Sequence, residues 1–408
     1  MSNKPYDPAR VFVRAAGFTE GIEWAFWLVL TVWWVVDLNL GPLELVLLGT
    51  VLEASVLLAE TPTGVVADLI SRKRSLIIAQ VVMGIGFIWA VASTNYWVIL
   101  PAQAVFGIGW TFRSGADTAW VTDELKGMGE HSDDDLDRLL IRKHRFGIAV
   151  ALIALPATIV IGELVSIRWA GFALGIIQIL MGGYFYFALR EDHFVPGRKK
   201  GRGFFETLQE GIAAVRGTPR LRMLVLVIVA LDMGAEGFDR LGYKHLLDSG
   251  STDDGSLLVL GALFIALAFA GLAVNAVAGR VVESGYGVAR LAVVLLAVAA
   301  IGGALASVTS IVVVIAIGYM MQDSTREALG PVLDGWANRD APAQVRATVH
   351  SLMGQATAIA ELVGGLMLGA IAELTSIPIV LGVSAGLFGL SSVLATRGVE
   401  RRPAQTGH

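Results

Sequence analysis

Apolar stretches of this sequence contain carboxylic acids and arginines at helical spacing. Glu20 and Glu23 lie three residues apart, and Arg113 and Asp117 lie four apart, so each pair falls on one face of a helix. An ionisable side chain within an apolar span is costly, and by default it indicates a functional site facing a bundle interior or a water-filled cavity. The other residues of this kind are Glu53, Glu60, Asp232, Glu236, Asp239, Asp323, Arg326 and Glu361.

The chemistry that these side chains suggest is proton exchange. Two carboxylates as close as Glu20 and Glu23 do not easily ionise together in a poorly hydrated site. A carboxyl group that gains and loses a proton near neutral pH is what proton coupling requires. Because acids outnumber bases in these stretches, we expect an electronegative site whose guests are protons and cationic or zwitterionic molecules.

A structural interpretation stands beside the functional one. Arg113 and Asp117 could form an ion pair within one helix and so fix its rotation, as could Asp323 and Arg326. Trp24 lies one turn from Glu20 and could stack on a cationic substrate. Contact of Trp24 with lipid or with another helix is the better interpretation.

The elements that carry these residues are predicted to be membrane helices. The chain has 408 residues, of which 55% are hydrophobic and 16% charged, against about 25% charged residues in soluble domains. About 20 apolar residues are needed to cross a bilayer as a helix, and twelve runs meet this length. We place them at 11–36, 43–66, 75–96, 98–122, 146–166, 169–189, 222–245, 257–279, 288–308, 311–334, 347–372 and 377–396.

Basic residues in the loops predict the orientation. Lys and Arg gather in the loops that share a side with both termini, so we expect both termini in the cytoplasm and the chain in the cell's inner (cytoplasmic) membrane. Apolar residues at helical spacing after span six predict a short amphipathic helix, from Phe204 to Val215, on the inner membrane surface. The predicted parts are a six-helix bundle over 1–190, a linker with this helix over 191–220, a second six-helix bundle over 221–396 and a cytoplasmic tail over 397–408.

The two halves share a short pattern. Glu20-Gly21-Ile22-Glu23 in span one is matched by Glu236-Gly237-Phe238-Asp239 in span seven, 216 residues later. Two-halved secondary transporters are built from such parallel repeats, with substrate and coupling ions near the bilayer midplane. The fold class that we expect is therefore all-α and integral to the membrane, with two pseudo-symmetric bundles.

The loop after span two carries a family signature. The segment from Glu60 to Ser75 resembles the cytoplasmic loop motif of the major facilitator superfamily, in which Gly and Asp precede a basic cluster. The resemblance implies a conformational latch made by Gly64, Asp68, Arg72, Lys73 and Arg74. We also expect Gly64 to allow close backbone approach and Asp68 to pair with a basic group or a helix N-terminus.

Two further segments are similar to the branch with proton-coupled tetracycline and macrolide exporters. They are the run that begins at Ser114 in span four and the run from Trp336 to Ser351 before span eleven. Two departures leave the direction of transport open. Gln103 stands where many drug antiporters have an arginine, and span five has Pro156 without the Gly-Pro-x-x-Gly-Gly motif.

These features together predict a secondary active transporter. The leading hypothesis is a proton-coupled antiporter that exports amphipathic, drug-like cations or zwitterions by alternating access. The alternatives are a proton symporter that imports a nutrient, a non-transporting membrane receptor, and an enzyme acting on lipid. We expect no enzymatic activity, because no catalytic constellation is found. No glycine-rich loop ends in a Walker A motif, so we expect that ATP is not the energy source.

The expected partners are a small-molecule substrate, protons and the lipid bilayer. The sequence has no cysteine and no histidine pair at zinc-ligand spacing, so we expect no metal, and a net charge of −4 argues against nucleic acid. We expect no cofactor, a proton gradient as the energy source, and a monomer.

Overall fold

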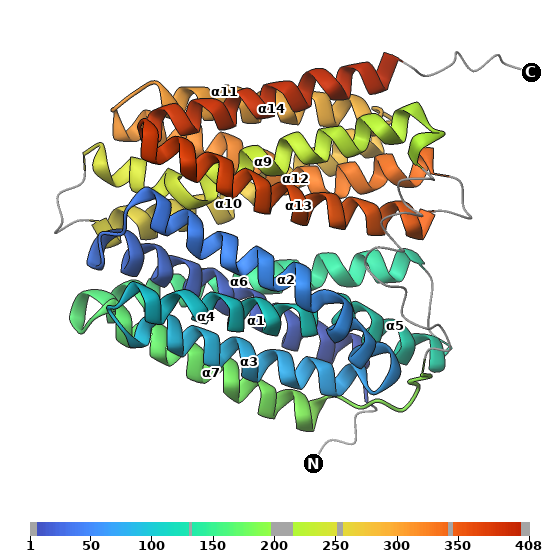
Figure 1. Ribbon diagram of the computed structural model, residues 1–408. Helices are drawn as coiled ribbons and strands as arrows, with labels where there is room; N and C mark the ends of the chain where they lie inside the picture. The colour runs from blue at the N-terminus through green and yellow to red at the C-terminus, as the bar shows by residue number, and fades with distance from the viewer. Residues whose placement is uncertain (1–5, 130–132, 197–214, 251–255, 342–345, 401–408) are drawn as a thin grey trace, which may run out of the picture. The chain divides into compact units, whose positions relative to one another are not determined.

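The protein is described by a computed structural model in which the chain folds almost entirely into α-helices (Figure 1). The structure describes residues 6–129, 133–196, 215–250, 256–341 and 346–400. Each predicted span coincides with one or two helices. The predicted amphipathic helix from Phe204 to Val215 lies outside the described residues except at its last residue.

The helices of the first half are α1 Pro8–Val32 with the π-helical turn η1 Trp33–Asp37, α2 Pro42–Leu69, α3 Arg72–Ala92, α4 Tyr96–Arg113, α5 Ala116–Gly127, α6 Asp133–Leu164 and α7 Ile167–Ala188. Those of the second half are α9 Pro219–Asp248, α10 Ser256–Glu283, α11 Val288–Ser307, α12 Val312–Asp340, α13 Arg346–Leu374 and α14 Ile377–Glu400.

Eight of the described helices are long and apolar enough to cross a membrane, namely α2, α3, α6, α7, α10, α11, α13 and α14. The remaining predicted spans fall on α1, α4, α9 and α12. These helices contain most of the acids and arginines that the sequence singles out, so their charges lower their hydropathy. The number of membrane crossings and the orientation of the chain remain predictions.

The predicted span over 98–122 is wrong as one continuous helix. The structure ends α4 at Arg113 and begins α5 at Ala116. Gly115 between them has a φ of +71°, in the left-handed region that only glycine enters without strain. This turn changes the direction of the chain inside the predicted span.

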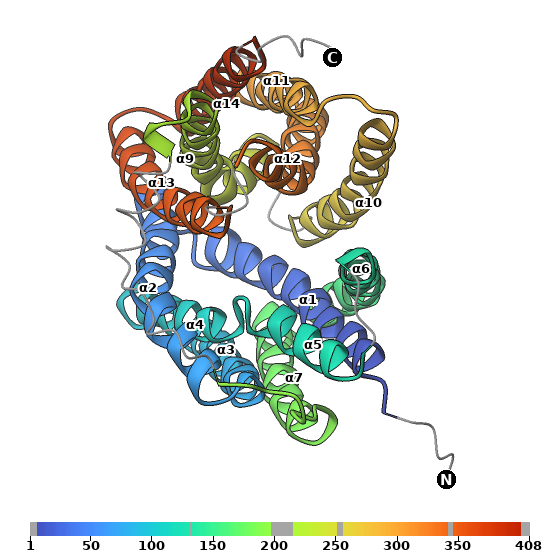
Figure 2. The ribbon, with the colours of Figure 1, turned by 90° about the vertical axis from the view of Figure 1, so that its right-hand side faces the viewer.

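The chain divides into two compact units. Unit 1 comprises 1–39, 51–202 and 257–261, and unit 2 comprises 40–50, 203–256 and 262–408. In unit 1, α1 packs on α6 and α7, and α3 packs on α4 and α7. In unit 2, α9 packs on α13 and α14, and α11 packs on α12 and α14, as Figure 2 shows in a view along the helices.

The same pairs of helices therefore meet in both units. When α1 is matched with α9, α3 with α11, α4 with α12, α6 with α13 and α7 with α14, each of these packing pairs has its counterpart. The sequence echo between Glu20 and Glu236 accordingly starts from equivalent helices.

Candidate functional site

Glycines bring α1 and α6 together at the first group of charges. A Cβ atom added at Gly21 would lie 2.5 Å from the carbonyl oxygen of Gly147, and one at Gly17 would lie 2.7 Å from that of Lys143. The two helices are thus packed backbone to backbone, as small residues allow in membrane proteins. Glu20, on the same helical face as Gly17 and Gly21, is placed directly against α6.

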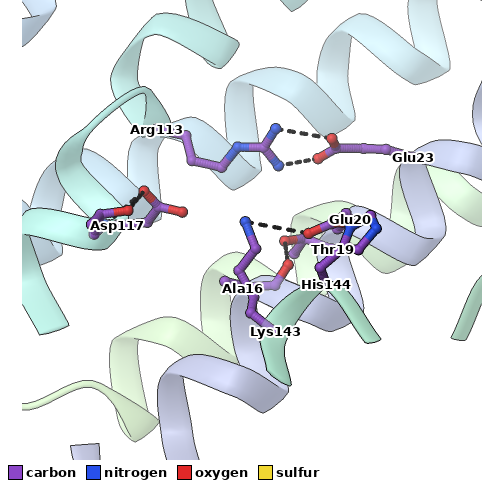
Figure 3. Close-up of polar contacts among 9 residues, drawn as sticks. Ala16, Thr19, Glu20, Glu23, Arg113, Asp117, Lys143 and His144 are labelled. Carbon is purple, nitrogen blue, oxygen red and sulfur yellow. Dashed lines mark hydrogen bonds and ion pairs between the residues drawn. The ribbon is translucent and has the colours of Figure 1, made fainter. Parts of the chain in front are cut away.

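Glu20 lies between two basic side chains of α6. His144 Nδ1 is 2.7 Å from Glu20 Oε1, and Lys143 Nζ is 3.3 Å from Glu20 Oε2 (Figure 3). The Glu20 and Lys143 side chains are mostly buried, whereas the His144 side chain is 36% exposed. The carboxylate of Glu20 is therefore neutralised by α6.

Glu23 has a different partner. Arg113, at the end of α4, donates to both carboxylate oxygens of Glu23, with Nη2 at 2.9 Å from Oε2. The guanidinium of Arg113 also lies over the Trp110 ring, 4.3 Å from its centroid. Bidentate pairing and stacking together hold an arginine in one geometry. Glu23 itself is only 5% exposed.

Asp117 acts on Arg113 electrostatically, but the hydrogen bonds of Arg113 go to Glu23. The helix breaks at Gly115 between them, so the i, i+4 relation that would join them is lost. Figure 3 shows Arg113 directed toward Glu23, with Asp117 on the other side of the break. Asp117 instead accepts hydrogen bonds from the backbone N–H and hydroxyl of Thr118.

Unit 2 repeats the ion pair of unit 1. Arg326 of α12 donates from Nη1 and Nη2 to the two carboxylate oxygens of Asp239 on α9, at 2.9 and 2.8 Å. Asp239 matches Glu23 in the sequence echo, and α12 matches α4 in the packing. Each unit thus joins its equivalent helices by an acid and an arginine.

Asp323 acts on Arg326 electrostatically, as the predicted pairing requires, but the hydrogen bonds given for Arg326 go to other residues. The guanidinium of Arg326 reaches across to Asp239 on α9. On its own helix, Arg326 donates from Nη1 to the side-chain oxygen of Gln322 at 3.2 Å. Asp323 lies half-buried on the same helix.

Two further acids of α9 have neighbours of different kinds. Glu236, 3% exposed, pairs with Arg240 one turn along α9, with Arg240 Nε at 3.2 Å from Oε2. The two residues lie four apart in the sequence, on one face of the helix. Asp232 accepts a hydrogen bond of 2.6 Å from the hydroxyl of Thr357 on α13. Asp232 is thus held by a neutral donor.

We call two groups of residues the α1 cluster and the α9 cluster. The α1 cluster consists of Glu20, Glu23, Arg113, Asp117, Lys143 and His144. The α9 cluster consists of Asp232, Glu236, Asp239, Arg240, Asp323 and Arg326.

The other predicted site residues lie on α1, α2 and α13. Glu53 and Glu361 are half-buried on α2 and α13, and Glu60 is exposed on α2. Trp24 is half-buried on α1. Among the described residues, no group of three or more histidines, aspartates and glutamates is arranged to hold a metal ion.

Two of the predicted latch residues, Arg72 and Lys73, contact residues that the sequence analysis does not name. Arg72 pairs with Asp123 of α5 at 2.5 Å and donates to the carbonyl of Ala119. Glu191, after α7, accepts from the backbone N–H of Lys73 at 2.9 Å and from the hydroxyl of Ser71. These contacts fasten the start of α3 to α5 and to the chain that follows α7. Arg74 is exposed.

Two expectations for the latch are not met. A Cβ atom on Gly64 would have no atom within 4 Å in the part of the chain that the structure describes, so no close backbone approach requires this glycine. Asp68 is exposed on the last turn of α2. Among the described residues, the backbone N–H groups at the start of α3 donate instead to the Ser71 hydroxyl and to the Glu191 carboxylate.

Several partners of the predicted acids and arginines among the described residues were not predicted, and four of them matter for the two clusters. They are Lys143, His144, Thr357 and Gln322. The basic run from Arg142 to Arg145 directly before span five is a signal that could have identified Lys143 and His144. On the sequence alone this run indicates only a cytoplasmic anchor.

No protein-family model matches the sequence, and no curated protein matches it. Solved structures match in fold. The nucleoside transporter NupG gives a TM-score of 0.76 at 13% identity, with 97% of this chain and 100% of that chain covered. PepTSo, a transporter of the POT family, gives 0.76 at 9% identity, with 97% and 98% covered.

A bacterial homologue of the human lysosomal transporter Spinster, inward-facing and occupied, gives a TM-score of 0.73 at 12% identity, with 98% of both chains covered. The chain therefore shares its fold with these solved transporters, which agrees with the fold that the resemblance implies. These structures are transporters and not enzymes, which agrees with the prediction of no enzymatic activity.

Proposed function

We propose that this protein is a proton-coupled secondary transporter that moves small cationic or zwitterionic organic molecules across the bilayer by alternating access. The observation that carries the proposal is the repeated ion pair, Glu23 with Arg113 and Asp239 with Arg326, on helices that we predict to cross the membrane. Charges in such segments are costly and are kept for function. The transporter fold agrees with this role.

The charges of unit 2 favour a substrate with a positive group. In the α9 cluster the acids outnumber the arginines, and the arginines are already engaged by Glu236 and Asp239. Asp232 is stabilised by the Thr357 hydroxyl alone among the hydrogen bonds of the described residues. A protonated amine or a proton would complete the neutralisation of this acid.

Exchange of substrate for protons is the direction that we favour. A proton and a cationic substrate are alternative ways to neutralise the same acid, so binding of one favours release of the other. Export driven by proton entry is the expected result in a cell. The proposed drug-like substrates follow from the resemblance to the exporter branch and from this charge balance.

Import of a zwitterion together with protons is the second candidate. It is favoured by the fold likeness to the POT family, of which one transporter has been solved in complex with 5-aminolevulinic acid. That molecule carries an amine and a carboxylate. In this chain Asp232 could receive the amine, and an arginine released from its acid could receive the carboxylate.

The test is a substrate screen in inverted membrane vesicles that follows collapse of an imposed pH gradient. Wild type is compared with Glu20→Gln, Glu23→Gln and Glu236→Gln. We expect at least one variant to bind substrate and to lose proton-driven transport. Full activity in all three would refute the assignment of the coupling residues. Gradient collapse in inverted vesicles indicates export, and collapse in right-side-out vesicles alone indicates import.

A further inference from the structure

The permanent charges of the α1 cluster do not balance. Glu20, Glu23 and Asp117 are acids, whereas Arg113 and Lys143 are the bases that carry a charge at every physiological pH. These groups act on one another, because Arg113 interacts electrostatically with Asp117 and Glu20, and Glu23 interacts with Glu20 and Lys143. Among these five groups the acids therefore exceed the permanently charged bases by one.

His144 is placed to supply the missing positive charge. Its Nδ1 lies 2.7 Å from Glu20 Oε1. An ionised carboxylate only accepts hydrogen bonds, so Nδ1 carries the hydrogen and Nε2 is the ring atom that takes up a further proton. The His144 side chain is 36% exposed, so the imidazole as a whole is in contact with water.

We propose that His144 is the proton-binding residue of unit 1, with Glu20 as the positioning residue that fixes its tautomer and stabilises its charged form. In this step Nε2 accepts one proton from water, and the cluster becomes neutral. Loss of the proton restores the negative charge. The assignment of this proton as the coupled one rests on the proposed function.

The neighbouring groups act on His144 in opposite senses. Lys143, next to it on α6, disfavours a second positive charge, and Glu20 on α1 favours it. Glu23 and Arg113 cancel each other as a closed pair. Asp117 of α5 adds a negative charge to the cluster through its interaction with Arg113, so the net charge of the named groups favours uptake of one proton.

Histidine is suited to this role because it is the side chain whose ordinary titration falls between about pH 5 and 8. Glu23 is tied to a guanidinium through both oxygens and is buried, which makes it a poor site for proton exchange. Glu20 and His144 therefore have separate roles, in which the acid stays ionised and the imidazole titrates.

The experiment is nuclear magnetic resonance of the full chain in lipid nanodiscs, with ¹⁵N-labelled histidine. The signal absent from His144→Gln identifies His144 among the six histidines. We expect this signal to titrate between about pH 5 and 8 in wild type. In Glu20→Gln its titration should move by about one to three pH units toward acid, because the imidazolium loses its carboxylate partner.

Glu163→Gln is the matched control, since Glu163 is an exposed acid at the far end of the same helix. It should leave the titration unmoved. A His144 signal that stays in one protonation state over the whole range would overturn the proposal, as would a titration that ignores Glu20→Gln.

The coupling itself is tested with any substrate that the vesicle screen identifies. His144→Gln should retain exchange of labelled for unlabelled substrate and should lose accumulation driven by a pH gradient, while His193→Gln retains both. Gradient-driven accumulation in His144→Gln would overturn the coupling role. If the resonance results hold and no substrate moves, the proposed function fails and the proton site stands.

Discussion

Among the individual residues, two arginines each bind one acid through both of its carboxylate oxygens. The attraction between two buried charges offsets the cost of removing them from water only when their geometry is good and the remaining hydrogen-bonding atoms are satisfied. The bidentate contacts of Arg113 with Glu23 and of Arg326 with Asp239 meet that condition. A lysine offers a single point of charge and would not replace either arginine.

Loss of one member of the first pair is predicted to destabilise the fold. Arg113→Gln leaves Glu23 buried without its cation, at a cost of about 3–5 kcal/mol in the free energy of unfolding. The double variant Glu23→Gln, Arg113→Gln should recover most of this, since two neutral amides can hydrogen-bond. Thermal unfolding in detergent measures the difference, with the exposed Arg74→Gln as control. Equal losses in the single and double variants would show that the pair is not the cause.

A second prediction separates stability from transport at Asp232. Asp232→Asn keeps an oxygen that accepts from the Thr357 hydroxyl, so thermal unfolding should change by less than about 1 kcal/mol. Transport should nevertheless be lost, because the amide cannot exchange a proton or pair with an amine. Vesicle uptake provides the measurement. Thr325→Val is the control, since that hydroxyl donates only to carbonyls of its own helix. Normal transport in Asp232→Asn would remove this acid from the mechanism.

The charged residues could be identified from the sequence, but their partners could not. Glu20 and Glu23 stand out in an apolar span, and their echo at Glu236 and Asp239 is real at the level of paired helices. Arg113 and His144, however, lie 90 and 124 residues from their acids, so no local spacing reveals the contacts. The local spacing rule is misleading at Asp117, because one glycine breaks the helix.

At the scale of elements, glycines decide where the charged helices meet. Gly21→Ala would place a Cβ atom 2.5 Å from the Gly147 carbonyl oxygen, so α1 must move from α6. We predict a loss of about 1–3 kcal/mol in stability, as for overpacked cores. Gly183→Ala, where the added atom has open space, should be neutral or stabilising by up to about 1 kcal/mol. Thermal unfolding of both variants distinguishes the effect of close packing from that of helix propensity. Equal melting temperatures of the two variants would contradict the close packing of α1 on α6.

The latch gives a prediction about rate. Asp123→Asn weakens the ion pair that ties Arg72 of α3 to α5, and we expect slower transport with substrate affinity within a few-fold of wild type. The family resemblance predicts the same for Asp68→Asn. Transport rate and equilibrium binding are measured on the same preparation, with Asp334→Asn as control on α12. A large change in affinity with an unchanged rate would show that the latch acts on binding.

Helices were the most predictable elements. Continuous apolar runs of membrane length leave little choice but a helix, because backbone groups must be satisfied within the segment. The break at Gly115 and the π-helical turn η1 were not predicted. Glycine is common in this chain, so Gly115 does not stand out in the sequence as the one that interrupts a span. The charged helices α1, α9 and α12 were recognised although their charges dilute the apolar signal.

At the scale of the whole molecule, the repeat is the informative feature. In both units an acid and an arginine join the first and fourth of the equivalent helices. The units differ in the other ionisable residues near these ion pairs. Unit 1 has a partly exposed histidine beside its acid, and unit 2 has an aspartate held by a hydroxyl. We interpret this difference as a division between a proton site and a site for a cationic group.

The most direct test is accumulation by the purified chain in liposomes across an imposed pH difference. A difference of one pH unit supplies about 1.4 kcal/mol for each coupled proton, enough for a tenfold concentration ratio of substrate. We predict that the steady-state ratio of a substrate found in the screen follows the pH difference and collapses when a protonophore is added. A substrate flux that is the same with and without the gradient, and that never exceeds equilibration, would contradict proton-coupled transport.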